Sequence, residues 1–262
     1  MATPALMYHE LKRPGRPLAD ADPGYVRYAI AQSRFEEHLA RIAAAGRRGV
    51  SLGQACKTGF GASGQVIITF DDGCQSDWVV GAPRLAEHGF GATFYVVSRW
   101  IGRRAGFLRG AELRALSEAG FEIGSHSATH AFLSDLDDAA LRRELADSRR
   151  EIEDILGRPV THLSCPGGRA GRRVADAARE AGYESLATSR IGVNGRATDP
   201  YALSRCPLRR DTPHGTFDAF CRGERLAALQ VREAALAAAK ALLGNRLYTS
   251  LRSVALRRAE SG

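Results

Sequence analysis

The sequence predicts an α/β protein built around a parallel sheet. Short apolar runs rich in β-branched and aromatic residues, such as 66–70 and 90–97, alternate with helical stretches of about ten to twenty residues. Parallel strands need helical crossovers of this length. The chain of 262 residues is long enough for one barrel or one large sheet domain. The alternation alone does not distinguish a barrel from an open, doubly wound sheet.

In the first half of the chain we expect strands at 5–9, 66–70 and 90–97 and helices at 33–46, 82–88 and 111–119. Ser33 and Glu36 are expected to form a capping box at the start of the first helix, whose apolar face consists of Phe35, Leu39 and Ile42. Residues 15–24, which are rich in proline, glycine and aspartate, and residues 53–64 are expected to be loops.

In the second half, the longest helix is expected at 135–156, where apolar residues recur on one face until Gly157 ends the pattern. A strand at 160–164, a helix at 173–181 and a strand at 183–188 follow. Residues 201–205 lead into a last strand-like segment. The tail, 217–258, is rich in alanine, leucine and arginine, and its leucines recur at near-heptad spacing, which predicts one or two amphipathic helices.

Composition narrows the class of protein. The hydrophobic content of 44% is that of an ordinary globular protein, and the net charge is +8. Nearly all basic residues are arginine, which suits anionic partners or reflects genome base composition. No nucleic-acid-binding motif accompanies the charge, so we expect no nucleic acid partner. The first thirty residues hold no apolar leader, and the five cysteines are scattered, so we expect a cytoplasmic protein with free thiols.

Polar side chains gather where two of the expected strands end. Asp71, Asp72 and Gly73 follow the run 66–70, and His126 and His130 follow the apolar segment 120–124. Such strand ends carry the chemistry of α/β folds. Two histidines four residues apart on a helical turn can share one metal ion. With one carboxylate they form a hydrolytic metal site that leaves a position open for water, and a second carboxylate is left over.

With these motifs the chain resembles the polysaccharide deacetylases, the NodB-homology or carbohydrate esterase family 4 enzymes, in the branch that begins with a Tyr-His segment. The resemblance spans roughly residues 5–210 and rests on Thr69-Phe70-Asp71-Asp72-Gly73 and on Ser125-His126-Ser127-Ala128-Thr129-His130. It implies an irregular, incomplete (β/α) barrel. We therefore expect a deacetylase domain at 1–214 and a helical, basic extension at 215–262.

The resemblance also implies roles for the paired motifs. Asp72, His126 and His130 are the expected ligands of one divalent metal, and Asp71 is the expected general base. Zinc is the expected ion, and cobalt, nickel and iron are alternatives that the same ligands accept. An N-acetylated carbohydrate is the expected substrate.

The third family motif, Arg-x-Pro-aromatic-Gly, is incomplete at 164–168, which is Ser-Cys-Pro-Gly-Gly. Pro166 matches, and the backbone N–H of Gly167 can still donate to an oxyanion. The arginine, which orients the base carboxylate in the family, is replaced by Ser164. We expect Arg205 to take its place from a neighbouring strand. A surface salt bridge is the alternative for Arg205.

The family's histidine general acid, which lies in a Leu-x-His setting near the C-terminus, has no counterpart in the sequence. His9, at the end of the first expected strand, is the candidate, because an imidazole can protonate a leaving amine near neutral pH. A structural histidine at a strand end is the alternative. His38, His88 and His162 lie in helix or strand patterns and are expected to be structural.

We therefore expect a metal-dependent hydrolase that removes N-acetyl groups from an amino sugar in a glycan or glycan precursor, as in exopolysaccharide or cell-surface polysaccharide biosynthesis. Two alternatives stay open, an amidase for a small non-sugar amide and a non-catalytic carbohydrate-binding protein with a decayed site. The tail from 215 to 262 has eight basic and four acidic residues. It is expected either to pack on the barrel or to contact an acidic membrane surface peripherally.

Overall fold

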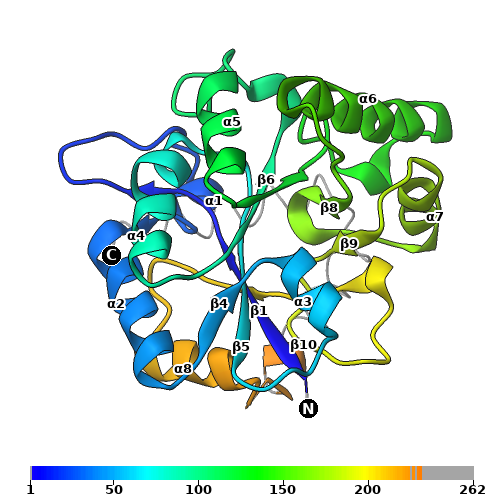
Figure 1. Cartoon of the computed structure of the whole chain (residues 1–262). Coiled ribbons are helices and arrows are strands. Elements are labelled where there is room, and N and C mark those ends of the chain that lie inside the picture. The colour runs from blue at the N-terminus through cyan, green and yellow to red at the C-terminus, as the bar shows by residue number, and fades with distance from the viewer. Residues whose placement is uncertain (1, 225, 228, 232–262) are drawn as a thin grey trace.

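The computed structural model describes residues 2–224, 226–227 and 229–231. A curled sheet, mostly parallel, forms the centre, and helices cover its outside (Figure 1). Its central strands lie in the order β1 (Thr3–Tyr8), β5 (Gln65–Phe70), β6 (Thr93–Val96), β7 (Glu122–Ser125), β8 (His162–Ser164) and β9 (Ser185–Ala187). Three short strands flank them, namely β4 (Arg48–Val50) beside β5, and β10 (Val193–Asn194) and β11 (Cys206–Pro207) beside β1. Among the strands that the structure describes, only β10 pairs antiparallel, with β1.

The helices follow the strands as crossovers, as parallel pairing requires. They are α1 (Pro23–Val26), α2 (Gln32–Ala44), α3 (Leu52–Thr58), α4 (Ala82–Glu87), α5 (Gly110–Glu118), α6 (Asp138–Leu156), α7 (Arg172–Glu180) and α8 (His214–Arg222). A separate two-stranded ribbon joins β2 (Leu11–Lys12) to β3 (Ile30–Ala31).

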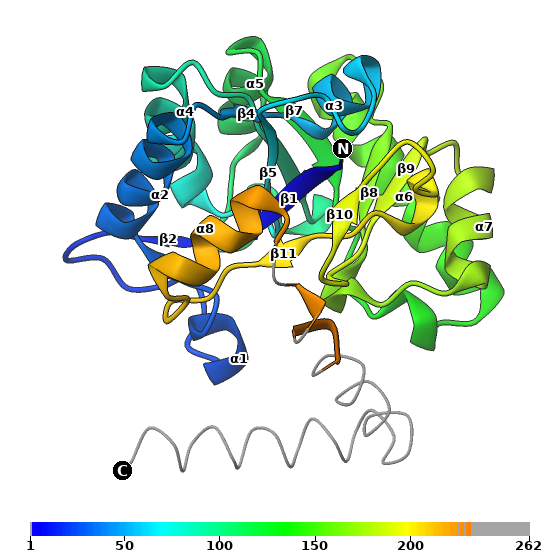
Figure 2. The ribbon, with the colours of Figure 1, turned by 90° about the horizontal axis from the view of Figure 1, so that it is seen from below.

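One short segment closes the barrel. Leu203 forms a parallel bridge with Ala187 of β9, and Cys206, three residues later, pairs with Leu6 of β1. The segment 203–207 therefore joins the two ends of the curled sheet (Figure 2). The irregular (β/α) barrel expected from the sequence is confirmed.

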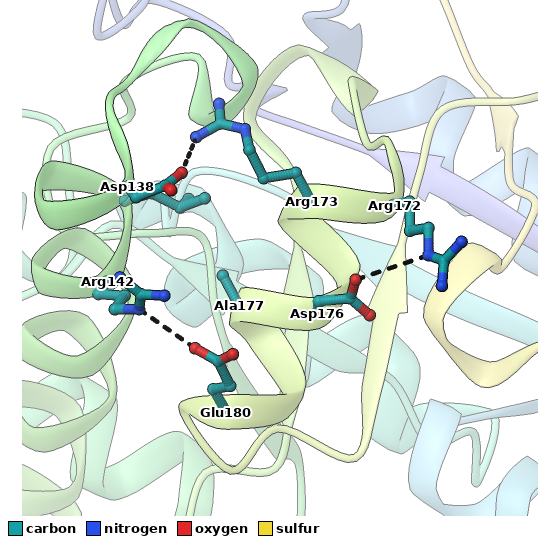
Figure 3. A pocket seen from close by; sticks show the side chains of 8 residues that line it. Asp138, Arg142, Arg172, Arg173, Asp176, Ala177 and Glu180 are labelled. Atoms are coloured by element: carbon teal, nitrogen blue, oxygen red, sulfur yellow. Dashed lines mark hydrogen bonds and ion pairs between the residues drawn. The ribbon is translucent and has the colours of Figure 1, made fainter.

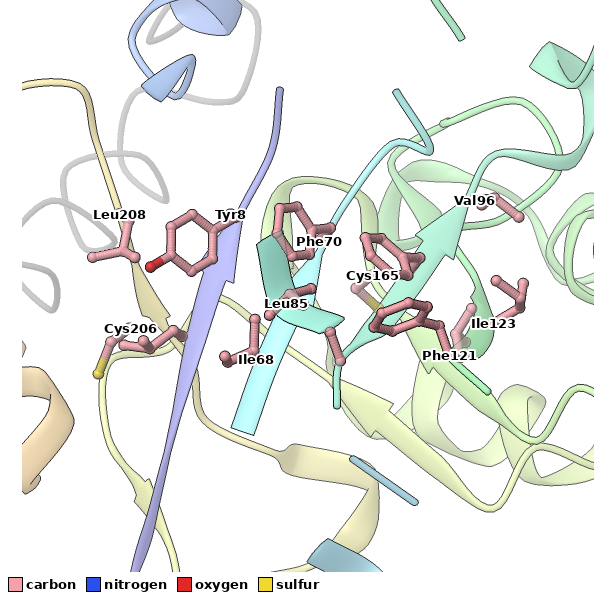
Figure 4. Close-up of a cluster of buried hydrophobic side chains, with 14 of the residues drawn as sticks. Tyr8, Ile68, Phe70, Leu85, Val96, Phe121, Ile123, Cys165, Cys206 and Leu208 are labelled. Carbon is pink, nitrogen blue, oxygen red and sulfur yellow. The ribbon is translucent and has the colours of Figure 1, made fainter. Parts of the chain in front are cut away.

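The core lies between the sheet and its helices. Tyr8, Phe70 and Phe94 stack across three adjacent strands, with ring centroids 5.2 Å and 4.8 Å apart. Figure 4 shows Tyr8 and Phe70 side by side on β1 and β5. Phe35 of α2 packs edge-on against both Tyr8 and Phe70. Because the strands are buried on both faces, they are continuous apolar runs rather than alternating ones. The same rings hold β1, β5 and β6 in place, and these strands lead into the polar loops.

Three local expectations are wrong. The segment 53–64 contains most of α3, whose N-terminus has a capping box: Ser51 accepts from the backbone of Gln54, and the Gln54 side chain accepts from the backbone of Ser51. The expected Ser33–Glu36 capping box is absent, because α2 begins at Gln32 directly after β3 and Ala31 is its N-cap. Helix α6 begins at Asp138, where Asp137 caps it, rather than at 135.

The core continues past residue 214, the expected domain boundary. Helix α8 packs against β1 (Figure 2), and it buries Phe217, Phe220 and Cys221, with Leu226 following. Residues 232–262 lie outside the described residues, so the extension and its membrane contact stay predictions. Among the described residues, no helix is long and apolar enough to cross a membrane.

Candidate metal centre

The three expected metal ligands meet at the C-terminal end of the sheet. Oδ1 of Asp72, which follows β5, lies 3.5 Å from Nε2 of His126 and 3.3 Å from Nε2 of His130, both of which follow β7. The three ligand atoms all lie within 4.8 Å of one another. Asp72 and His126 are buried, whereas the His130 side chain is 32% exposed. One side of the cluster is therefore open to solvent.

An unusual backbone conformation brings these side chains together. Among the described residues, the non-glycine residues with left-handed φ are Asp72 (78°), Ser127 (66°) and His130 (66°). Residues 126–130 form an irregular loop after β7 with a bend at 128–129, so the expectation of a helical turn is wrong. The left-handed residues turn both imidazoles inward, with ring centroids 5.1 Å apart. This conformation is costly away from glycine and is concentrated at functional sites in folded proteins.

The donor set fits a divalent cation. Nδ1 of His126 lies 2.9 Å from the backbone carbonyl of Ser164, which can only accept, so Nδ1 carries the proton and Nε2 presents its lone pair. Oδ1 of Asp72 is buried without a hydrogen-bond partner among the described residues. A cation bound between these atoms would satisfy both.

The protonation states of Asp72 and His126 agree with ligation. Burial lowers the pKa of His126 to about 4, which keeps the imidazole neutral. Burial raises the pKa of Asp72, but the nearby imidazoles of His130, His9 and His126 outweigh that effect, and the net pKa is lowered. The site therefore offers an ionised carboxylate and a neutral imidazole.

The second carboxylate, Asp71, is held by Arg205. Nη1 and Nη2 of Arg205 donate to the two carboxylate oxygens at 2.7 Å and 2.8 Å, and Arg205 is 1% exposed. The alternative of a surface salt bridge is therefore wrong. Burial raises the pKa of Asp71, but the Arg205 charge outweighs it and the pKa is lowered. Oδ2 of the ionised Asp71 lies 4.0 Å from Nε2 of His126.

Other donors of Arg205 are satisfied as well, which fixes its orientation. Nε donates to the carbonyl of Thr188 at 2.9 Å, and Nη1 also donates to Oγ1 of Thr69 at 3.1 Å. Nη2 donates to Oγ of Ser164 at 2.8 Å.

Sequence reasoning missed Ser164 as a member of this network. Its hydroxyl lies 3.3 Å from each oxygen of Asp71, in addition to its bond with Arg205. The signal was present, because a small residue stands where the family motif has arginine, and the small side chain leaves room for a guanidinium from another strand.

The remaining candidates lie at the same end of the barrel. Pro166 and Gly167 form a single turn after β8, and Gly167 is exposed with φ 64°. His9 follows β1, and its ring centroid lies 4.8 Å from that of Tyr28. Nδ1 of His9 is buried without a hydrogen-bond partner among the described residues. The imidazole of His9 is one of the groups that lower the pKa of Asp72.

A pocket between α6 and α7 is a weaker candidate for a site. Its charged residues pair with one another, as Arg173 with Asp138 at 2.9 Å, Arg142 with Glu180 at 3.2 Å and Arg172 with Asp176 at 3.8 Å (Figure 3). These exposed pairs are typical of a solvated helix interface.

Comparisons with known proteins cover the part of the chain that holds most of the site. Residues 61–186 match the family model described as polysaccharide deacetylase, and this span includes Asp71, Asp72, His126, His130, Ser164 and Gly167. His9 and Arg205 lie outside it.

Two relatives and one solved structure illustrate the similarity. YxkH of Bacillus subtilis, whose name assigns it to the same family, is 28% identical over 155 residues, 59% of this chain and 55% of the relative. A peptidoglycan-N-acetylglucosamine deacetylase of Bacillus cereus is 28% identical over 122 residues, 46% of this chain and 54% of the relative. The chain thus spans about half the length of these curated relatives. The Streptococcus pyogenes deacetylase PplD superposes with a TM-score of 0.72 at 19% identity, covering 84% of this chain and 98% of that chain. With this fold, and with the family motifs assembled at one end of its sheet, the chain is similar to the polysaccharide deacetylases.

Proposed function

We propose that the protein is a metal-dependent N-deacetylase that hydrolyses the acetamido group of an amino sugar in a glycan or glycan precursor. The observation that carries this proposal is the buried pair of Asp71 and Arg205 beside the cluster of Asp72, His126 and His130. A carboxylate fixed 4.0 Å from a ligand nitrogen is placed to accept a proton from water at the cluster.

Asp72, His126 and His130 would hold the metal. When bound, a divalent metal supplies a Lewis acid that polarises a carbonyl oxygen and lowers the pKa of water. Among the ions that these ligands accept, zinc is our proposal.

The other residues perform proton transfer and charge stabilisation. Asp71 takes a proton from the attacking water, and Arg205 is a positioning residue that keeps this carboxylate ionised and correctly oriented. The backbone N–H of Gly167 donates to the oxygen that gains negative charge. His9 donates a proton to the sugar nitrogen as the C–N bond breaks, so that acetate and a free amine leave.

The named relatives support a sugar substrate. The Bacillus cereus relative is named for N-acetylglucosamine in peptidoglycan, and a Rhizobium leguminosarum relative is named a chitooligosaccharide deacetylase. We place the protein in exopolysaccharide or cell-surface polysaccharide biosynthesis on this basis. A cytoplasmic location, with peripheral membrane contact through the tail, stays a prediction from the sequence.

Acetate release tests the proposal. N-acetylglucosamine oligomers would be incubated with wild type, metal-stripped protein, zinc-restored protein, Asp71→Asn, and His88→Gln as a control at an exposed histidine. We expect release by wild type, restored protein and the control alone. Bound metal without release from any N-acetyl sugar would point to a small-amide hydrolase, to be assayed on cyclic ureides. Absence of both metal binding and release would favour a carbohydrate-binding protein.

A further inference from the structure

We propose that Phe132 and Arg169 form an anion-binding subsite at the rim of the metal centre. The preferred substrate would then be an N-acetylated amino sugar that carries a phosphate or carboxylate group next to the acetylated ring. This inference rests on the proposed function and names its substrate class.

In the proposed subsite, an aromatic side chain from one loop lies where the family motif has an aromatic side chain from another loop. The family motif has an aromatic residue where this chain has Gly167, and Phe132 fills the space that a side chain there would occupy. A Cβ atom on Gly167 would lie only 2.6 Å from Cε1 of Phe132. The ring therefore lies directly on the turn whose N–H is the proposed oxyanion donor.

Phe132 is also more exposed to solvent than a residue of the hydrophobic core. It is 39% exposed, although it is a large apolar side chain only two residues after His130. One edge of the ring lies close to the Gly167 turn, and part of the side chain is open to solvent. An aromatic surface beside a candidate active site is a common element of ligand recognition.

Arg169 lies over this ring. Its guanidinium carbon is 4.3 Å from the ring centroid of Phe132, which is a cation–π contact. Nη1 of Arg169 is buried, and it has no hydrogen-bond partner among the described residues. Among the residues that the structure describes, no carboxylate forms an ion pair with Arg169. Arg104, another arginine stacked on an aromatic ring, does have such a partner, because it pairs with Asp20 at 2.6 Å.

A buried guanidinium nitrogen without an acceptor is costly, and an anionic ligand would supply the acceptor. The planar fork suits the paired oxygens of a phosphate or carboxylate. Because Arg169 follows Gly167 by two residues, the anion would lie beside the ring whose acetamido group faces the metal centre. A phosphate of a lipid- or nucleotide-linked sugar and the carboxylate of a neighbouring uronic acid share this chemistry.

Kinetics on matched substrates test the proposal. The anionic probes are N-acetylglucosamine 1-phosphate, UDP-N-acetylglucosamine and a hyaluronan tetrasaccharide, and the neutral probe is tri-N-acetylchitotriose. The variants are Arg169→Met, Arg169→Lys and Phe132→Leu. Arg172→Met removes an equal charge from a side chain that is 95% exposed and serves as the control.

We expect Arg169→Met to raise KM for at least one anionic probe about 10- to 100-fold, with kcat and the neutral probe nearly unchanged. Arg169→Lys should restore part of the loss, and Phe132→Leu should show a smaller loss of the same kind. The anionic probe affected identifies phosphate or carboxylate as the recognised group. Equal effects on neutral and anionic probes, or an equal effect of Arg172→Met, would overturn the subsite.

A binding measurement separates this inference from the proposed function. If no probe releases acetate, calorimetry of the anionic probes with wild type and Arg169→Met still decides the question. Binding that weakens at least tenfold in Arg169→Met supports the subsite without the deacetylase activity. Absent or unchanged binding overturns it.

Discussion

Both terminal nitrogens of Arg205 donate hydrogen bonds to the Asp71 carboxylate, at 2.7 Å and 2.8 Å, in a part of the barrel closed to solvent. The two residues are 134 positions apart in the chain. Replacement of Arg205 by methionine should lower kcat for acetate release about 100-fold, because the base carboxylate loses its orientation and its partner charge. It should also destabilise the fold by about 3–5 kcal/mol, since Asp71 remains as an unpaired buried charge. Initial rates and urea unfolding measure the two effects.

A double variant separates the two effects. Asp71→Asn added to Arg205→Met should recover part of the unfolding free energy, because the uncompensated charge is gone, while the activity stays lost. Full turnover by folded Arg205→Met would show that Arg205 has no positioning role.

Removal of either histidine ligand should abolish tight metal binding. For His126→Ala and for His130→Ala we expect the affinity for zinc to fall more than tenfold, because each variant keeps only two of the three protein ligands. Elemental analysis after dialysis, with chelator competition, provides the measurement. His88→Ala is the matched histidine control. Unchanged zinc stoichiometry in both ligand variants would place the metal elsewhere.

A change of leaving group tests His9 as the general acid. His9→Gln should lower kcat on an N-acetyl sugar about 100-fold or more, because the amine leaves only with a proton. The same variant should hydrolyse p-nitrophenyl acetate at close to the wild-type rate, since that leaving group needs no proton. Equal losses of activity on the two substrates would assign His9 a structural role. His162→Gln, at a histidine expected to be structural, is the control for the loss of activity that such a role produces.

His38 should make the fold sensitive to acid. It is fully buried in α2, accepts from or donates to the Tyr8 hydroxyl at 3.1 Å, and stacks on Phe217. Burial lowers its pKa to about 3 from 6.5. The unfolded chain therefore binds the proton first, so the contribution of His38 to stability is complete above pH 6.5 and is lost as the pH falls toward 3. Between pH 6.5 and 4.5 we expect a loss on the order of 2 kcal/mol.

Urea unfolding across this pH range checks the expectation. His38→Gln, which keeps a hydrogen-bonding group for Tyr8, should flatten the slope of unfolding free energy against pH even if it lowers stability overall. His88→Gln should leave the slope as it is in wild type. A slope in His38→Gln as steep as that of wild type would contradict the assignment.

Liposome sedimentation tests the membrane contact expected of the basic tail. The packing of Leu226 shows where a deletion can begin without opening the core, and removal of 232–262 leaves this residue in place. We expect the full chain, and not the shortened one, to sediment with vesicles containing acidic lipid, with less binding at high salt. Equal sedimentation of the two proteins would leave the tail without this role.

The sequence predicted the elements whose signals are local and strong. Continuous apolar runs located the central strands, and Gly157 located the end of α6. The capping box of α3 was visible in the sequence as Ser51 and Gln54, but the flanking glycines suggested a loop. Short strands such as β4 carry too few residues for a pattern and depend on their neighbours in the sheet.

The site was predictable where its residues are adjacent in the chain and less so where folding brings them together. Asp72, His126 and His130 stand in compact motifs, yet the left-handed backbone that aims them could not be inferred from non-glycine residues. Arg205 could be proposed because a motif lacked its arginine. Ser164 was noted only as the replacement of the motif arginine. Its own role could not be predicted, because it depends on the side chain of Arg205, which comes from a distant part of the chain.

The segment 203–207 places Arg205 between Leu203, which contacts β9, and Cys206, which contacts β1. During synthesis, Asp71 emerges from the ribosome long before the residue that is to orient it. In a nascent or partly opened chain the carboxylate of Asp71 therefore lacks the guanidinium that orients it. Any chemistry that depends on this pair can begin only after the ends of the sheet are joined. In this protein the step that joins the two ends of the sheet also brings the guanidinium of Arg205 to the carboxylate of Asp71.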